Sequence, residues 1–227
     1  MMKLLLFDID GTLVLSGGAG LRAMNEAFFR LFGLEDRMLR LNLAGRTDTA
    51  ILQTVMQDNG LSFSVEAQEK FKALYFQLLR KELRDHNPQK RVMPGVRELL
   101  SALCRRDHIY LGLLTGNWEQ SGRLKLADLN LNRYFSFGAF ADDSGIRDEL
   151  LPFAVRRFSE RYALHPAPEQ IYVIGDTPFD IQCARPHGAI AVAVAAAQHN
   201  EKQLAAHQPD YLFPDLSDLE RVLQVLG

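Results

Sequence analysis

Short, unbroken hydrophobic runs recur along the chain and predict strands. Because polar and apolar positions do not alternate in them, each strand should be covered on both faces, as in a parallel sheet. The runs occupy residues 3–7, 109–114, 135–140, 171–175 and 189–194. Helical patterns lie between and after them, at residues 94–103, 118–128, 149–162 and 216–226. This alternation predicts an α/β fold with a Rossmann-like, doubly wound parallel sheet.

One interval breaks this rhythm. The first predicted strand ends near Asp8 and the second near Thr115, whereas a strand–helix–strand unit takes about 30 residues. Within the interval, two sets of apolar residues each share a helix face: Met24, Ala27, Phe28, Leu31 and Phe32, and Phe71, Leu74, Tyr75, Leu78 and Leu79. The glycine-rich stretch at 16–20 can act as a hinge. We therefore predict an inserted, all-helical cap on an α/β core. The cap covers residues 16–88, and the core covers residues 1–15 and 89–227.

Polar residues follow the predicted strands. In open α/β sheets, ligands bind at the carboxyl ends of strands, so these residues are candidates for a site. They are Asp8 and Asp10 after the first strand, Thr115, Gly116 and Asn117 after the second, Arg147 beyond the third, and Asp176 and Asp180 after the fourth. This set suits phosphoryl transfer, because a carboxylate can act as nucleophile and clustered carboxylates favour a hard cation such as Mg²⁺. A hydroxyl and backbone N–H groups can hold phosphate oxygens, and a cation offsets their charge.

The motifs at these strand ends resemble the signature regions of the haloacid dehalogenase superfamily. DIDGTLV at 8–14, LLTGN at 113–117, the lone cation Arg147 and GDTPFD at 175–180 occur in the order found there. MPGVRELLSAL at 93–103 also resembles the segment that returns from cap to core. The resemblance covers essentially the whole chain and is to the phosphoglycolate-phosphatase-like branch, which has a helical, C1-type cap.

The resemblance implies a magnesium-dependent phosphatase that hydrolyses small phosphate monoesters through an aspartyl-phosphate intermediate. Asp8 would be the nucleophile, and Asp10 would be the general acid that protonates the leaving alcohol and then activates water. Thr115 and the Gly116 amide would bind phosphate. Asn117 would either contact phosphate as well or serve only to start the next helix.

The resemblance also implies a metal site. Asp176 would bind Mg²⁺ together with Asp8 and the backbone carbonyl of Asp10. Asp180 would support the metal's water shell or pair with the basic residue of the third region. That region departs from the family pattern, because many relatives have lysine–proline there and this chain reads GIRD at 145–148. No lysine occurs between Lys125 and Lys202, so Arg147 is the candidate for the cation.

A break in the helical pattern at 43–48 predicts a loop at the end of the cap. Gly45 allows a tight bend, and Thr47 or Asp48 can cap the helix that follows. In relatives the matching loop faces the active site and selects the leaving group. The resemblance would therefore place Arg46 at the far end of the substrate, and the alternative is a surface arginine beside a helix cap.

Other functions fit these residues less well. A dehalogenase needs no acid two residues after the nucleophile, whereas Asp10 supplies one. A phosphonate hydrolase would need a cap lysine and usually a small residue at position 10. A phosphosugar mutase shares the carboxylate pair and the cap, but its relatives carry a histidine in the first cap helix, where this chain has Gly20 and no histidine before His86. A non-catalytic binding module would usually have lost one of the residues that survive here.

Composition bears on the cellular location and the partners of the protein, and not on its chemistry. A net charge of −2, with 47% hydrophobic and 24% charged residues, is typical of soluble globular proteins and argues against a nucleic-acid surface. The longest apolar run, 189–197, is shorter than the ~18 residues of a membrane span. We therefore expect a cytoplasmic monomer or homodimer that acts on a small phosphorylated metabolite, with no nucleic-acid or membrane partner.

Overall fold

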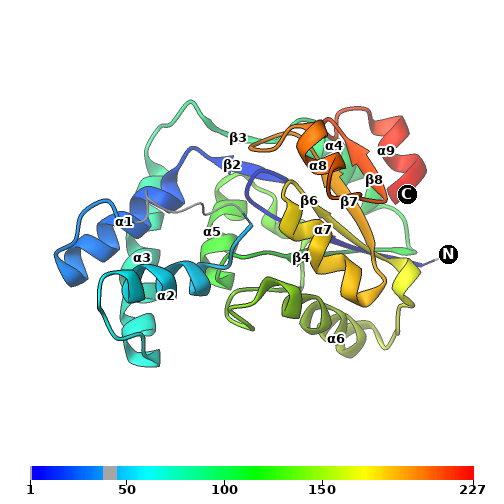
Figure 1. Cartoon of the computed structure of the whole chain (residues 1–227). Coiled ribbons are helices and arrows are strands. Elements are labelled where there is room, and N and C mark those ends of the chain that lie inside the picture. Colours follow the sequence, from blue (N-terminus) through cyan, green and yellow to red (C-terminus); the bar gives the residue numbers. More distant parts are fainter. Residues whose placement is uncertain (1, 38–44) are drawn as a thin grey trace.

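The computed structural model describes residues 2–37 and 45–227. It shows an α/β core with a group of helices packed at one end, and both chain termini lie on the core, away from those helices (Figure 1). Within the described residues, no helix is long and apolar enough to cross a membrane.

The core is built around one six-stranded sheet in the order β5-β4-β1-β6-β7-β8, and all neighbouring strands run parallel. The strands are β1 (Lys3–Phe7), β4 (Ile109–Leu114), β5 (Gly138–Ala139), β6 (Ile171–Gly175), β7 (Ile190–Val194) and β8 (Tyr211–Phe213). The parallel, doubly wound sheet that the sequence predicts is confirmed. The strand expected at 135–140 is shorter than predicted, because only two of its residues pair with β4, and the edge strand β8 was not predicted.

Helices cover both faces of this sheet. They are α4 (Val96–Leu103), α5 (Glu119–Asp128), α6 (Leu150–Tyr162), α7 (Pro178–Ala184), α8 (Glu201–Ala205) and α9 (Leu219–Leu226), with short 3₁₀ turns η2 (Asn132–Tyr134), η3 (Arg147–Glu149), η4 (Pro168–Gln170) and η5 (Arg185–His187). Successive side chains of a strand point to opposite faces. Leu5 and Phe7 of β1 therefore pack with α4 and α9, whereas Leu4 and Leu6 pack with α6 and α7. The four core helices expected from the sequence are confirmed.

The cap helices lie between two short strands that the sequence did not predict. β2 (Val14–Ser16) and β3 (Lys90–Val92) pair antiparallel, with Leu15 opposite Arg91, and so join the outgoing and returning chain into one two-stranded stalk. α1 (Ala19–Phe32), α2 (Asp48–Asp58) and α3 (Val65–Arg84) follow β2. The expectation of an insert that is helical throughout is therefore wrong at its first residue, Ser16, while the boundaries at 16 and 88 stay predictions.

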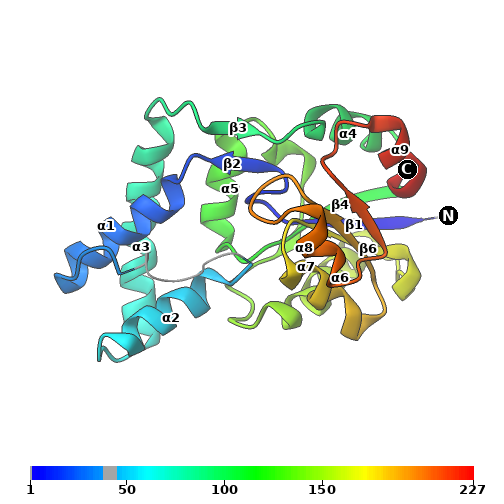
Figure 2. The same ribbon diagram turned by 45° about the horizontal axis from the view of Figure 1, so that its top comes forward.

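The helices of the cap share a hydrophobic cluster with the core. Phe28 of α1 and Phe71 of α3 meet edge to face, with ring centroids 6.4 Å apart. Trp118, which precedes α5, is completely buried among these cap side chains. Leu31, expected on the packed face of α1, is exposed instead. Figure 2 shows α5 lying between the cap helices and the sheet, so the cap packs against α5.

Candidate active site

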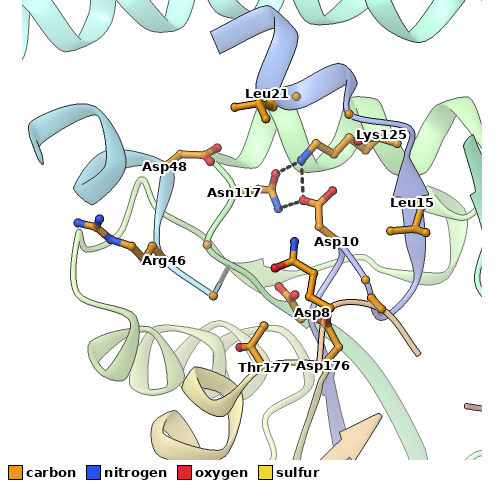
Figure 3. A pocket seen from close by; sticks show the side chains of 18 of the residues that line it. Asp8, Asp10, Leu15, Leu21, Arg46, Asp48, Asn117, Lys125, Asp176 and Thr177 are labelled. Carbon is orange, nitrogen blue, oxygen red and sulfur yellow. Dashed lines mark hydrogen bonds and ion pairs between the residues drawn. The ribbon is translucent and has the colours of Figure 1, made fainter. Parts of the chain in front are cut away.

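The predicted site residues meet at the carboxyl ends of β1, β4 and β6, beneath the cap. A cavity of about 550 Å³ opens there and is lined by core residues, by the stalk and by cap residues such as Leu21 of α1. Figure 3 shows Asp8, Asp10, Asn117 and Asp176 gathered on the core side of this cavity. Sequence positions separated by more than a hundred residues are therefore brought to one edge of the sheet.

Three carboxylates form the deepest part of the site. One oxygen from each of Asp8, Asp176 and Asp180 lies within 4.8 Å of the others, and all three residues are buried. Burial raises the pKa of Asp8 to about 6, against the opposing effect of the Arg147 guanidinium. Burial and the neighbouring carboxylates Asp8 and Asp180 also raise the pKa of Asp176 well above its usual range. Such shifts mark a place where negative charge is crowded and short of solvent.

Local backbone geometry allows this crowding. Gly11 has a φ of +87°, and a Cβ atom there would lie 2.3 Å from Asp176 Oδ2, so only glycine lets the turn after β1 approach β6 this closely. Thr12 Oγ1 donates to Asp176 Oδ1 at 3.3 Å. At the start of α7, the backbone N–H and the hydroxyl of Thr177 both donate to Asp180 Oδ2, which orients that carboxylate.

Arg147, the candidate for the basic residue of the third signature region, lies against these carboxylates. It lies in η3, it is buried, and its Nη2 is 3.2 Å from Asp8 Oδ1 and also contacts Asp180 Oδ1. Despite burial, which lowers it, the pKa of Arg147 is raised by Asp180 and Asp8, so the guanidinium stays charged. Asp180 therefore pairs with Arg147, and its support of a metal's water shell stays a prediction.

The residues after β4 form the second wall. Thr115 is completely buried, and Asn117 Nδ2 donates both to its hydroxyl, at 2.9 Å, and to Asp10 Oδ2, at 2.8 Å. The Asn117 side chain therefore joins Thr115 to Asp10, and its contact with phosphate stays a prediction. Gly116 lies so close to the cap that a Cβ would be 2.3 Å from the carbonyl oxygen of Arg46.

Lys125 is a residue of the site that the sequence analysis missed. It lies in α5 with only 6% of its surface exposed, and its Nζ lies 2.5 Å from Asp10 Oδ2 and 2.6 Å from Asn117 Oδ1. Burial lowers its pKa, but the carboxylates of Asp10 and Asp48 raise it above the usual value overall. Lys125 follows Ser121 by four positions, which places both on one face of α5, and both are buried. The sequence alone does not distinguish this face from an exposed one.

Asp48, an acidic residue at the start of α2, connects the cap to the core. Its Oδ2 accepts from Trp118 N at 2.9 Å and from Ser121 Oγ at 3.1 Å, so a cap carboxylate caps the core helix α5. Beside it, Trp118 Nε1 donates to Thr49 Oγ1 at 2.8 Å. These bonds hold the start of α2 against the core.

Ionisation of Asp48 should cost stability, which predicts a pH effect. Burial raises its pKa to about 6 although Lys125 opposes this, and Asp10 and Tyr75 also face it. Because the folded pKa lies above the unfolded value of 3.8, the unfolded chain binds fewer protons between these two values. Stability therefore falls as pH rises from about 4 to about 6 and then levels off. The free energy of unfolding of Asp48→Asn should therefore rise relative to that of wild type between pH 4 and 8, by on the order of 3 kcal/mol.

Urea unfolding of both proteins at each pH, with chelator present throughout, measures this difference. Asp142→Asn is a matched control, because Asp142 also accepts from the start of α5, at Glu119 N, but is half-exposed. The difference in stability between Asp142→Asn and wild type should not grow as pH rises. A gap between Asp48→Asn and wild type that stays constant or closes with rising pH would show that Asp48 is not buried as a costly anion.

Arg46 does not reach toward Asp8 and Asp10 in this structure. Its Nη2 donates to Thr54 Oγ1 of α2 at 2.7 Å, and Figure 3 shows the side chain turned away from Asp8 and Asp10 although the residue lines the cavity. Contact between Arg46 and the far end of the substrate stays a prediction. The predicted helix cap is confirmed, because Thr47 Oγ1 accepts from Ala50 N at 3.1 Å. Part of the predicted loop, at 43–44, lies outside the described residues.

The donor set fits a magnesium ion. Asp8, Asp176 and Asp180 offer hard oxygen ligands within one small volume, and Mg²⁺ takes such ligands together with water and substrate oxygens. Burial is the main cause of the raised pKa values of Asp8 and Asp176, and a bound cation would favour their ionised forms. Asp180 is already engaged by Arg147 and Thr177, so it is the least available of the three.

Comparisons with known proteins agree with this geometry. The family model of the haloacid dehalogenase-like hydrolases matches residues 5–185. A phosphoglycolate phosphatase of Synechococcus elongatus is 29% identical over 96% of this chain and 95% of that protein. A solved structure of a predicted phosphoglycolate phosphatase from Haemophilus somnus has a TM-score of 0.73 at 22% identity and covers 98% of both chains.

A structural neighbour with another activity has the same fold. The β-phosphoglucomutase of Clostridium difficile superposes with a TM-score of 0.75 at 17% identity, over 99% of this chain and 96% of that one. The fold therefore does not separate a hydrolase from a mutase. The family model spans the strands that precede Asp8, Thr115 and Asp176. The expected family and enzyme class are confirmed: this chain belongs to the haloacid dehalogenase-like hydrolases.

Proposed function

We propose that this protein is a magnesium-dependent phosphatase that hydrolyses small phosphate monoesters through an aspartyl-phosphate on Asp8. One observation carries the proposal: Asp8 is buried beside Arg147 at 3.2 Å, and Asp10 lines the same cavity. This arrangement supplies a nucleophile, a cation for phosphate charge and a second carboxyl group for proton transfer, which are the elements that covalent phosphoryl transfer requires.

The reaction would proceed in two steps. The Asp8 carboxylate attacks phosphorus, the bond between phosphorus and the leaving oxygen breaks, and Asp10 donates a proton to that oxygen. Asp10, now a carboxylate, takes a proton from water as the water oxygen attacks phosphorus, which releases phosphate and restores Asp8. Arg147 would offset the charge of the phosphoryl oxygens throughout, and Thr115 and the Gly116 amide would bind them. Mg²⁺, held by Asp8, Asp176 and the Asp10 carbonyl, would neutralise charge on the nucleophile and the phosphoryl group.

The similarity to phosphoglycolate phosphatases supports a small phosphorylated metabolite as the substrate. The protein would act in the cytoplasm, as a monomer or homodimer. The loop that carries Arg46 remains the candidate for recognising the far end of the substrate.

A phosphosugar mutase is the second candidate, because β-phosphoglucomutase has this fold. The structure favours hydrolysis over it at Gly20. A Cβ at Gly20 would lie 3.4 Å from Lys125 Nζ, so the lysine occupies the space next to the position where a mutase-like histidine is expected. In this chain the basic side chain that reaches Asp10 is Lys125 of the core helix α5, and it does not come from the cap. A movement of the cap would therefore leave Lys125 beside Asp10.

Metal removal tests the proposal directly. With p-nitrophenyl phosphate or acetyl phosphate as substrate, excess chelator should abolish turnover and Mg²⁺ should restore it, because without a metal ion the single charge of Arg147 does not offset the three clustered carboxylates, which repel phosphate. Ca²⁺ should inhibit, since it prefers more ligands and a looser geometry. Equal turnover of a pure, folded sample in chelator and in Mg²⁺ would exclude the proposed mechanism.

A further inference from the structure

Asp10 is less enclosed than the other carboxylates of the site. Its side chain is 40% exposed, whereas Asp8 and Asp180 are almost fully buried. An exposed carboxylate on a turn has several rotamers available, and a general acid must lie within hydrogen-bond reach of the leaving oxygen. Something must therefore restrict the orientation of Asp10.

Two donors from α5 and the residues before it supply that restriction. Lys125 Nζ and Asn117 Nδ2 both contact Asp10 Oδ2, at 2.5 and 2.8 Å. Lys125 Nζ also donates to Asn117 Oδ1 at 2.6 Å, so the three side chains form a closed triangle (Figure 3). Among the described residues both donors meet the same oxygen, which leaves Oδ1 available to the reacting group.

The lysine itself is held in place. Lys125 is buried, and Gly20 of α1 lies over its end, since a Cβ at Gly20 would be 3.4 Å from both Cε and Nζ. Asn117 is fixed in turn by its bond to Thr115 Oγ1 at 2.9 Å. Charge-assisted hydrogen bonds are the strong ones, and the anchored partners allow little movement of the ammonium group.

We propose that Lys125 is a positioning residue that, together with Asn117, orients the Asp10 carboxyl group toward the leaving oxygen. The proposal rests on the phosphatase mechanism above, in which Asp10 is the general acid. Lys125 acts through Asp10 and does not touch the phosphoryl group. Misplacement of a catalytic group by about 1 Å can cost on the order of 100-fold in rate, so loss of this contact should be visible in kinetics.

The dependence on the leaving group is the test. Lys125→Met removes the ammonium but keeps an unbranched side chain of similar length. On an alkyl phosphate, whose leaving oxygen needs a proton, kcat/KM should fall about 10–100-fold. On p-nitrophenyl phosphate, whose leaving group is a stable anion, it should fall less than about threefold. The ratio kcat/KM is used because it reports formation of the aspartyl-phosphate, before the water step that both substrates share.

A double-mutant cycle separates positioning from a structural role. In an Asp10→Asn background, Lys125→Met should cause no further loss on the alkyl phosphate, because the group it orients is already absent. Lys70→Met is the matched control: Lys70 pairs with Glu66 on the exposed face of α3, and its removal should leave both substrates unaffected. If Lys125→Met does not fold, Lys125→Gln, which keeps an amide donor, should show the same dependence with a smaller loss.

Three results would overturn the proposal. They are equal losses on the alkyl and aryl phosphates, a further loss in the Asp10→Asn background, and a rise in KM that accounts for the whole effect and so indicates a substrate contact. The underlying function fails in a different way, because a wild-type protein without magnesium-dependent turnover of either substrate would reject the phosphatase itself.

Discussion

Asp8→Asn is expected to abolish turnover, lowering kcat/KM by on the order of 10⁴–10⁶, as removal of the nucleophile does in other covalent enzymes. An amide oxygen does not attack phosphorus, and Asp180, the other carboxylate that contacts Arg147, does not line the cavity. The fold should survive, because asparagine has nearly the same volume and Arg147 keeps its contact with Asp180. Burial already disfavours the charge on Asp8, so a neutral residue there should not lower the thermal midpoint.

Asp143→Asn is the matched control for this experiment. Asp143 is also a nearly buried carboxylate that pairs with an arginine, Arg157, at 2.6 Å, but it does not line the active-site cavity. The control should retain turnover. In wild type, reduction of acid-quenched samples with borohydride should convert Asp8 to homoserine, which mass spectrometry detects. Turnover of Asp8→Asn within about tenfold of wild type, or a modification found elsewhere, would rule out Asp8 as the nucleophile.

The site residues that were easiest to predict from the sequence are those that directly follow a strand. Asp8, Thr115 and Asp176 each follow a hydrophobic run directly, and parallel strands bring their carboxyl ends to the same edge. Arg147 could be predicted because the stretch contains no lysine. These inferences need only the strand order and the short motifs, so the site could be outlined without coordinates.

Lys125 and Asp48 escaped prediction because their roles depend on how elements pack. Lys125 contacts Asp10 across 115 positions, through the orientation of α5 beneath the cap. Thr47 or Asp48 was expected to cap α2, and Thr47 does so. The Asp48 carboxylate instead accepts from Trp118 N and Ser121 Oγ at the start of α5 in the core. Local capping rules predict the residue type correctly and cannot choose between helix ends that are distant in sequence.

The short strands show the same limit. β2, β3 and β8 have three residues each, which is too few for a hydrophobic pattern to distinguish them from loops. Yet β2 and β3 form the stalk through which the cap connects to the core, and Leu15 and Arg91 of that stalk line the cavity. The cap and stalk side of the cavity was therefore the least predictable, whereas the core side could be predicted from motifs.

Removing Arg147 should have the second-largest effect on activity. Arg147→Ala leaves three clustered carboxylates without their guanidinium, and kcat/KM should fall by at least about 10²–10³, the cost of losing one group that stabilises transition-state charge. Arg147→Lys should recover part of this activity, because the charge is kept while the contact of one Nη2 with both Asp8 and Asp180 is lost. Both variants are assayed with saturating Mg²⁺ on p-nitrophenyl phosphate.

Loss of stability must be separated from loss of chemistry, because breaking a buried ion pair typically costs about 3–5 kcal/mol. Arg157→Ala provides the comparison, since Arg157 pairs with Asp143 in the core but does not line the active-site cavity. It should lower the thermal midpoint without a comparable loss of kcat/KM below that midpoint. Arg147→Ala should lose activity at temperatures where it is fully folded, and Arg147→Lys should exceed it in rate. If Arg147→Ala, when folded, turned over as fast as wild type, another cation would have to serve the phosphoryl group and the assignment of the third motif region would be wrong.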